Sequence, residues 1–182
     1  MRKPRSSLFR GCSLGLVLGV LLLALQPAGA QSLSAQDVQL VCNVLGFLDP
    51  AATSGVVAVV YDPASAGSKA DADAIVGSFG GGVTAEQANY TAKSVSSADL
   101  AEGGGFVAII EASGVGGGDR VMHAARVRKI LCATGDKSAV QAGKCVMAVS
   151  SGTEVEIVVS ARAAAAAGIN FVTAFRTLIT EI

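Results

Sequence analysis

A glycine-rich loop, one histidine and a few cysteines are the residues of this sequence with types suited to chemistry. The loop, "GVGGGDR" from Gly114 to Arg120, follows an apolar run and opens a helix, the place where backbone N–H groups bind phosphate in many α/β proteins. Asp119 takes the sixth place of the G-x-G-x-x-G pattern, and no Walker lysine and hydroxyl follow. Because a carboxylate at the loop's mouth repels anions, we interpret the segment as a flexible loop capped by Asp119.

His123 is the only histidine of the chain, and it lies in the helical segment "DRVMHAARVRK". No serine or cysteine stands with it in a recognised nucleophile arrangement. No set of His, Cys and carboxylate residues has the spacing of a metal site. We therefore expect an exposed or half-buried helical histidine, with no catalytic residue, no cofactor and no metal. An enzyme is the least favoured class of function.

The same helix carries a basic side formed by Arg120, Arg126, Arg128 and Lys129. A solvated face explains these residues, since cations near a helix C-terminus are favoured by the helix dipole. The functional alternative is a surface that binds an acidic partner. We keep the four residues as a candidate partner surface.

Three cysteines follow residue 30, and their positions favour one disulfide. Cys132 ends one predicted strand and Cys145 begins the next, so neighbouring strand ends bring the two sulfurs within reach of each other. We predict a Cys132–Cys145 disulfide, with free thiols as the alternative. Cys42 lies on the apolar stripe of the first helix and is expected to be a small buried apolar residue. The odd count leaves an intermolecular bridge open.

Residues 1–30 have the features of a secretory signal peptide. Four basic residues precede an apolar run of about a dozen residues, and Ala28-Gly29-Ala30 is a small-x-small cleavage pattern. An uncleaved membrane anchor is the alternative, but the run falls short of the roughly 20 residues that a spanning helix needs. We predict a periplasmic protein with a mature chain of residues 31–182.

Removal of the leader makes the chain acidic. Four of the 14 basic residues lie in residues 1–30, which leaves 10 against 14 acidic ones, a net charge near −4. Nucleic acid and anionic membrane surfaces reward clustered Lys and Arg, so we expect no nucleic-acid partner and no direct membrane insertion after cleavage.

Apolar periodicity predicts alternating helices and strands in residues 31–182. "GVVAVVY" and "FVAIIE" are continuous apolar runs, as expected of strands buried on both faces, and a Ser-Ser-Gly turn at 150–152 predicts a late hairpin. The alternation implies a single-domain α/β three-layer sandwich with a mainly parallel sheet and a late antiparallel strand. The expected helices are 34–49, 69–79 and 119–128, with a helical turn at 138–141 and a closing helical region at 161–180. The expected strands are 55–61, 90–95, 106–111, 130–133, 146–149 and 154–159.

The C-terminal stretch resembles that of the YfiR-type periplasmic proteins. A strand pair runs into an alanine-rich helix that ends in Ala-Gly-aliphatic, followed by a terminal helix with apolar positions. The matching residues are Ala163, Ala164, Ala167, Gly168, Ile169, Phe175 and Leu178. Ser160 and Arg162 depart from the family's Asn and acidic residue. Cys132 and Cys145 are similar to the close pair that stabilises some members.

The resemblance implies a regulatory protein, often a homodimer, that binds and restrains a membrane-bound diguanylate cyclase through the cyclase's periplasmic domain. Cyclic di-GMP and biofilm formation are then the expected outputs. The alternative function is a small-ligand-binding periplasmic module, because "VVYDPASAGSKADADAIVGSF" also looks like the first strand, loop and helix of one lobe of a substrate-binding protein.

Overall fold

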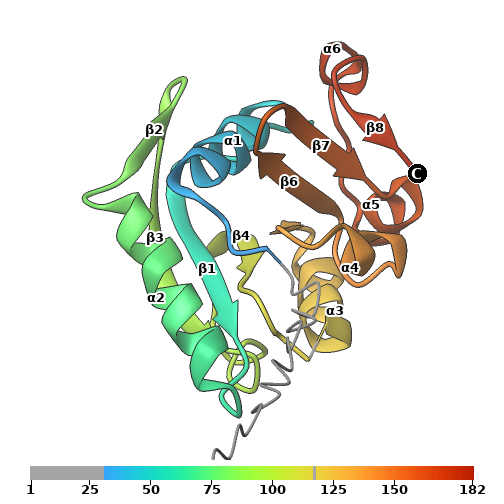
Figure 1. Cartoon of the computed structure of the whole chain (residues 1–182). Helices are drawn as coiled ribbons and strands as arrows, with labels where there is room; N and C mark the ends of the chain where they lie inside the picture. The colour runs from blue at the N-terminus through green and yellow to red at the C-terminus, as the bar shows by residue number, and fades with distance from the viewer. Residues whose placement is uncertain (1–30, 117) are drawn as a thin grey trace, which may run out of the picture.

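The computed structural model describes residues 31–116 and 118–182, so the predicted signal peptide at residues 1–30 lies outside the described residues. Helices and strands alternate along this chain (Figure 1). The helices are α1 (Ala35–Gly46), α2 (Ala66–Phe79), α3 (Gly118–Arg128), α4 (Lys137–Gln141), α5 (Ala161–Ala167) and α6 (Thr173–Arg176). The strands are β1 (Gly55–Tyr61), β2 (Val83–Ala85), β3 (Ala88–Ser96), β4 (Phe106–Glu111), β5 (Leu131–Thr134), β6 (Met147–Ser151), β7 (Val155–Val159) and β8 (Thr180–Glu181).

The strands of the described chain form one eight-stranded sheet in the order β2-β3-β1-β4-β5-β6-β7-β8. The five central strands, from β3 to β6, are parallel, and β7 returns antiparallel to β6. The prediction of a mainly parallel sheet with a late antiparallel strand is therefore confirmed. A second antiparallel strand, β2, pairs with β3 at the opposite edge and was not expected, because three residues between a glycine cluster and a turn carry no periodic signal.

Helices cover both faces of this sheet, as the predicted sandwich requires. α1 packs beside α2 on one face, and α3 packs beside α5 on the other (Figure 1). Residues Val57–Val60 of β1 have no exposed surface, since β1 lies between two strands and two helical layers. The strand register then places Val60 of β1, Glu111 of β4 and Thr134 of β5 on the α3 face of the sheet.

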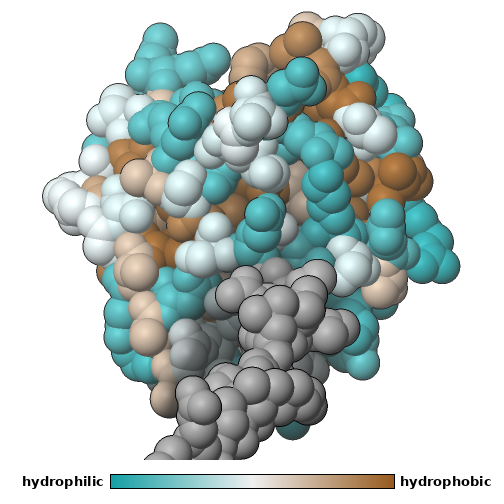
Figure 2. Space-filling model, in the orientation of Figure 1, coloured by the Kyte–Doolittle hydropathy of each residue, from teal (hydrophilic) through white to brown (hydrophobic). Residues whose placement is uncertain are grey.

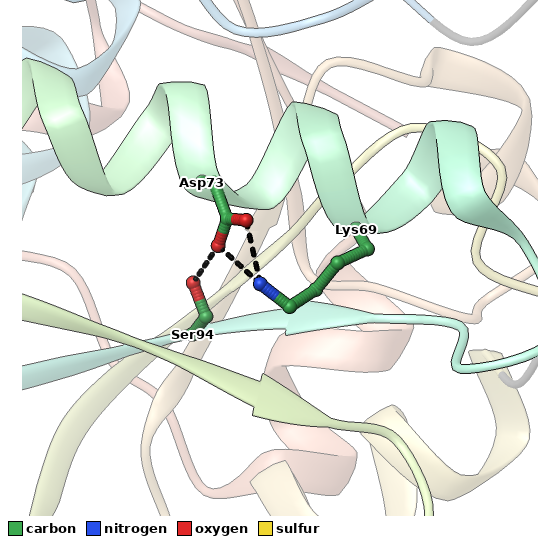
Figure 3. A network of polar contacts seen from close by, with 3 residues as sticks. All are labelled: Lys69, Asp73 and Ser94. Carbon is green, nitrogen blue, oxygen red and sulfur yellow. Dashed lines mark hydrogen bonds and ion pairs between the residues drawn. The ribbon is translucent and has the colours of Figure 1, made fainter.

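A polar network attaches α2 to the sheet (Figure 3). Ser94 Oγ of β3 donates to Asp73 Oδ1 over 2.8 Å, and the Lys69 ammonium pairs with the same carboxylate one helical turn away. The hydrogen bond from Lys69, with the one from Ser94, lowers the pKa of Asp73. Lys69 also lies 5.2 Å from the centre of the Tyr61 ring. These contacts fix α2 over β1 and β3.

The first helix has the predicted cap but a shorter body. Ser34 Oγ accepts from Asp37 N, and the Asp37 carboxylate accepts from Ser34 N, so the capping box is present with Asp in place of Glu. The helix ends at Gly46, before the predicted end at Asp49. Backbone bonds to the segment 170–172 take over there, from Asp49 N to Asn170 O and from Val172 N to Phe47 O, each 2.9 Å.

The closing helical region expected over 161–180 contains two short helices, α5 and α6, and its remaining residues are not helical. Gly168 adopts a left-handed conformation with φ of +67° and ends α5 after seven residues. The chain then runs extended beside the end of α1, forms the four-residue α6, and finishes as β8 beside β7. Phe175 stacks on Phe47 with ring centres 5.2 Å apart. The conformation of this segment is therefore set by contacts with distant residues rather than by local helix propensity.

The connection from β3 to β4 crosses over β1 without a helix. Residues 97–105 form turns only, although strand-to-strand crossovers in such sheets usually carry a helix that covers the face. On the α3 side of β3, the side chains of Asn89, Thr91 and Lys93 consequently stay exposed. This gap in the outer layer borders α3 and creates the larger of the two candidate sites.

Candidate functional site

An open groove, which we name the α3 groove, runs between α3 and the β3–β4 connection. Its volume is about 700 Å³, and its exposed lining is mainly apolar. Val127 stands on its helical wall with 68% of its surface exposed, the second-highest exposure among the large apolar residues of the described chain. The groove is lined by Ser97, Ala98, Leu100, Ala101, Asp119, Arg120, His123, Ala124, Val127 and Arg128.

Arg128 holds the two walls of the groove together. Its Nη2 donates to the carbonyl oxygens of Leu100, at 2.7 Å, and Ala101, at 3.1 Å. The guanidinium carbon lies 6.0 Å from the centre of the Phe106 ring. Nη1 is buried without a hydrogen-bond partner among the described residues. The groove's shape therefore depends on one half-buried cation.

The structure divides the four predicted partner-surface residues. Arg120 lines the groove and is exposed, so a partner can reach it. Arg126 on α3 and Lys129, directly after the helix, are exposed outside the groove lining. Arg128 is the exception, because its guanidinium is occupied by the β3–β4 connection. The charge pattern of the helix does not distinguish this internal role from a surface one.

His123 is exposed, as expected, and the groove also brings Ser97 and Asp119 to its lining. The spacing of these three residues in the sequence does not associate them. No hydrogen bond connects His123 with either of the others in the described chain, whereas a nucleophile and its base need hydrogen-bond reach. The groove thus presents surface rather than an assembled proton-transfer chain.

A smaller, polar cavity lies where β4 and β5 end, and we name it the carboxyl-edge cavity. Its volume is about 200 Å³. In open parallel sheets this edge, beside the strand where the order reverses, is where ligands bind. The lining residues are Glu111, Ala112, Gly114, Val115, Thr134, Asp136, Ser138, Ala139, Ala142 and Lys144.

Glu111 is the unusual group of this cavity. Only 6% of its surface is exposed, and burial raises the pKa of its carboxyl to about 7, with the Asp136 carboxylate adding to the rise and Lys144 opposing it. Its side chain accepts no hydrogen bond from the described residues. From the sequence, Glu111 was treated only as the last residue of a predicted strand. The signal that could have identified it as a site residue is its position as the single acid at the end of an otherwise apolar run.

The neighbours of Glu111 are held in place. Asp136 Oδ1 accepts from the backbone N and the hydroxyl of Ser138, at 2.8 and 2.7 Å. The stem of Lys144 lies on Gly118 at the start of α3, where a Cβ atom on residue 118 would come within 2.9 Å of Lys144 Cβ. The cavity therefore has an acidic floor and one cation beside the first turn of α3.

Asp119 is not the cap of the helix that follows the glycine-rich loop, contrary to our interpretation of the sequence. α3 begins at Gly118, so Asp119 lies inside the first turn and not at the cap position. Asp62 and Asp119 both line a cavity at this helix end, together with Ser97, Gly116 and Arg120. Two carboxylates there disfavour an anion, in agreement with the interpretation as a loop.

The predicted disulfide is present, and the remaining cysteine of the described chain is buried. Cys132 and Cys145 are bonded, with their Cα atoms 5.3 Å apart, which fits an oxidising compartment. Cys42 is free and has no exposed surface, and burial raises the pKa of its thiol to about 12. It is thus an unreactive apolar residue, as predicted.

Within residues 31–116 and 118–182, no helix is long and apolar enough to cross a bilayer.

A second apolar surface lies near the C-terminus. Figure 2 shows it toward the upper right, over the region of α6, β7 and β8 in Figure 1. Its most exposed apolar side chains are Val155, Val172, Leu178 and Ile182. We name these four residues the C-terminal patch. It provides an apolar surface with which the α3 groove can be compared by mutation.

No protein-family model matches the sequence, and no curated protein matches it. Two solved structures share the fold. An ABC domain in complex with L-Trp from Streptococcus pneumoniae has a TM-score of 0.54 and 12% identity, over 79% of this chain and 59% of that one. A conserved domain protein from Vibrio cholerae has a TM-score of 0.54 and 16% identity, over 81% of this chain and 59% of that one. The chain therefore spans about three-fifths of either protein, and at these identities the likeness concerns the fold alone.

Proposed function

We propose that the protein is an exported regulator that binds the periplasmic domain of a membrane-bound diguanylate cyclase and restrains it. The observation that carries the proposal is the α3 groove, an exposed apolar surface beside which Arg120, Arg126 and Lys129 offer positive charge. Contiguous apolar surface with a polar rim is typical of protein-binding sites. The disulfide and the resemblance of the C-terminal stretch to YfiR-type proteins support the proposal.

The charge around the groove defines the partner surface. The cations stand at its side, while Ala101, Ala124 and Val127 give it an apolar lining. A partner that buries apolar side chains in the groove and places carboxylates at its rim would be complementary in both respects. Homodimer formation remains a prediction without an assigned contact surface.

Deletion of the gene in its native host tests this function. We expect cyclic di-GMP and surface-attached growth to rise, and the wild-type gene to reverse both. Complementation with Val127→Asp should fail, because a carboxylate in the groove repels an acidic partner, whereas Val155→Asp in the C-terminal patch should restore repression. Unchanged cyclic di-GMP after deletion would exclude the regulatory function. Full repression by Val127→Asp would exclude the groove as its surface.

A second candidate function is the binding of a small molecule. Its support is the carboxyl-edge cavity, where the carboxyl of the buried Glu111 receives no hydrogen bond from the described residues. The fold is also shared with an ABC domain in complex with L-Trp. Thermal-shift screening of the exported protein against a metabolite library tests it. A stabilising compound together with no protein partner in a pull-down would favour this function over the first.

A further inference from the structure

The floor of the carboxyl-edge cavity lacks a hydrogen-bond donor. Glu111 is almost fully buried and faces Asp136, and no donor from the described residues reaches its carboxyl. Among the described residues, the fully buried side-chain atoms without a partner are Asp37 Oδ1 and Arg128 Nη1, so the Glu111 carboxyl oxygens, which are not among them, open onto the cavity. A ligand that donates hydrogen bonds into the floor would satisfy both carboxyl groups at once.

The mouth of the cavity has the opposite charge. Lys144 is exposed and lines the cavity, and the carbon stem of its side chain lies against Gly118 at the start of α3. The mouth therefore favours an anionic group, while the floor favours a cationic one.

This arrangement disfavours ligands with a single charge. A simple amine could donate to the Glu111 and Asp136 carboxyl groups, but its positive charge would be repelled by the Lys144 ammonium. A simple anion could pair with Lys144, but it would be repelled by Asp136. A metal ion is also disfavoured, because the described residues contain no group of three or more His, Cys, Asp or Glu side chains able to hold one. The volume of about 200 Å³ is below the roughly 300–1,000 Å³ of pockets for drug-sized ligands.

We propose that the carboxyl-edge cavity binds a small zwitterion, whose ammonium group contacts Glu111 and Asp136 and whose acidic group faces Lys144. The inference rests on the second candidate function and specifies its ligand class. Two opposite charges on a short linker match the acidic floor and the Lys144 ammonium at the mouth together.

NMR titration of the exported protein tests this inference. The probes are glycine, β-alanine, γ-aminobutyrate and taurine, and propylamine and propionate are the single-charge controls. We expect at least one zwitterion to shift the amide signals around Glu111 and Asp136, with a Kd near or below about 1 mM. The single-charge compounds should bind at least about tenfold more weakly, which corresponds to about 1.4 kcal/mol.

Matched variants locate the ligand. Glu111→Gln and Lys144→Met should each weaken binding of the same zwitterion by about tenfold or more. Lys137→Met is the control, since Lys137 is a nearby exposed lysine that pairs with Glu156 outside the cavity. Glu111→Gln removes a buried ionisable group and keeps the side-chain shape, so the variant is expected to fold.

Three results would overturn the proposal. They are no binding of any zwitterion probe at about 10 mM, equal binding of propylamine or propionate, and unchanged affinity in Glu111→Gln. A library compound that binds elsewhere while all four probes fail would retain the ligand-binding function and exclude the zwitterion. Failure of both probes and library would exclude the two together.

Discussion

The buried carboxyl of Glu111 predicts a specific dependence of stability on pH. Burial raises its pKa from 4.5 to about 7 in the folded protein, so the folded state holds this proton more tightly than the unfolded chain does. The associated stability is fully present below about pH 4.5 and is lost as the pH rises toward 7. At about 1.4 kcal/mol per pH unit, the loss amounts to about 3 kcal/mol.

The Glu111→Gln variant removes this titration and leaves a side chain of the same shape. Urea unfolding of the ligand-free protein should show the variant gaining about 3 kcal/mol over the wild type between about pH 4.5 and pH 8. Glu154→Gln, at an exposed position, is the control and should track the wild type. A wild-type-to-variant difference that stays constant within about 0.5 kcal/mol across this range would refute the burial argument.

Three further predictions concern the disulfide, the groove and the start of α3. Reduction of Cys132–Cys145, which are 13 residues apart, should lower the free energy of unfolding by about 3 kcal/mol on the chain-entropy model, and an unchanged urea midpoint would contradict this. Arg128→Met should speed amide exchange in residues 97–103 and lower the free energy of unfolding by about 1–3 kcal/mol, because it removes the hydrogen bonds to Leu100 and Ala101. Arg126→Met should change neither quantity, and equal effects of the two substitutions would show that these hydrogen bonds are unimportant. Gly118→Ala should destabilise by about 1–3 kcal/mol through contact with Lys144, while Gly77→Ala, in open space on α2, should stabilise by about 0.5–1 kcal/mol, as thermal melts can determine.

The central architecture was predictable from local pattern. β1 and β4 are continuous apolar runs because they are buried on both faces, and the polar turns between them and the helices are explicit in the sequence. The antiparallel β7 followed from the short turn before it. These features depend on neighbours in the sequence, so a single sequence is sufficient to place them.

The edges of the fold depended on contacts that the local pattern does not contain. β8 has two residues and pairs with β7 after residues 168–172 have made backbone hydrogen bonds with the end of α1. The end of α5 agrees with the Ala-Gly-aliphatic signal at 167–169, where Gly168 takes the left-handed conformation. The residues after it were expected to be helical, but 169–172 are extended and contact the end of α1.

The candidate sites were less predictable than the fold. The basic side of α3 was visible as a charge pattern, but the role of Arg128 needs the position of Leu100, 28 residues away. The cause of the groove is visible in the sequence. Residues 97–105 are fewer than the dozen or more residues of a typical crossover connection, which usually contains a helix. The pKa of Glu111 depends on burial and on Asp136 and Lys144, which lie on separate segments.

Both candidate sites use α3, and this has a physical consequence. The first turn of the helix meets Lys144 of the carboxyl-edge cavity through Gly118, and its exposed side forms one wall of the α3 groove. A rigid helix transmits a displacement at one end to the other, and any effect of a cavity ligand on a groove partner must be matched by an equal effect of the partner on the ligand. Gly118 permits the close approach of Lys144 to α3. A bulkier residue at 118 would push Lys144 and α3 apart and would leave Val127 and Arg128 unchanged. A displacement of α3 would therefore be felt at both sites, because each of them has this helix at its border.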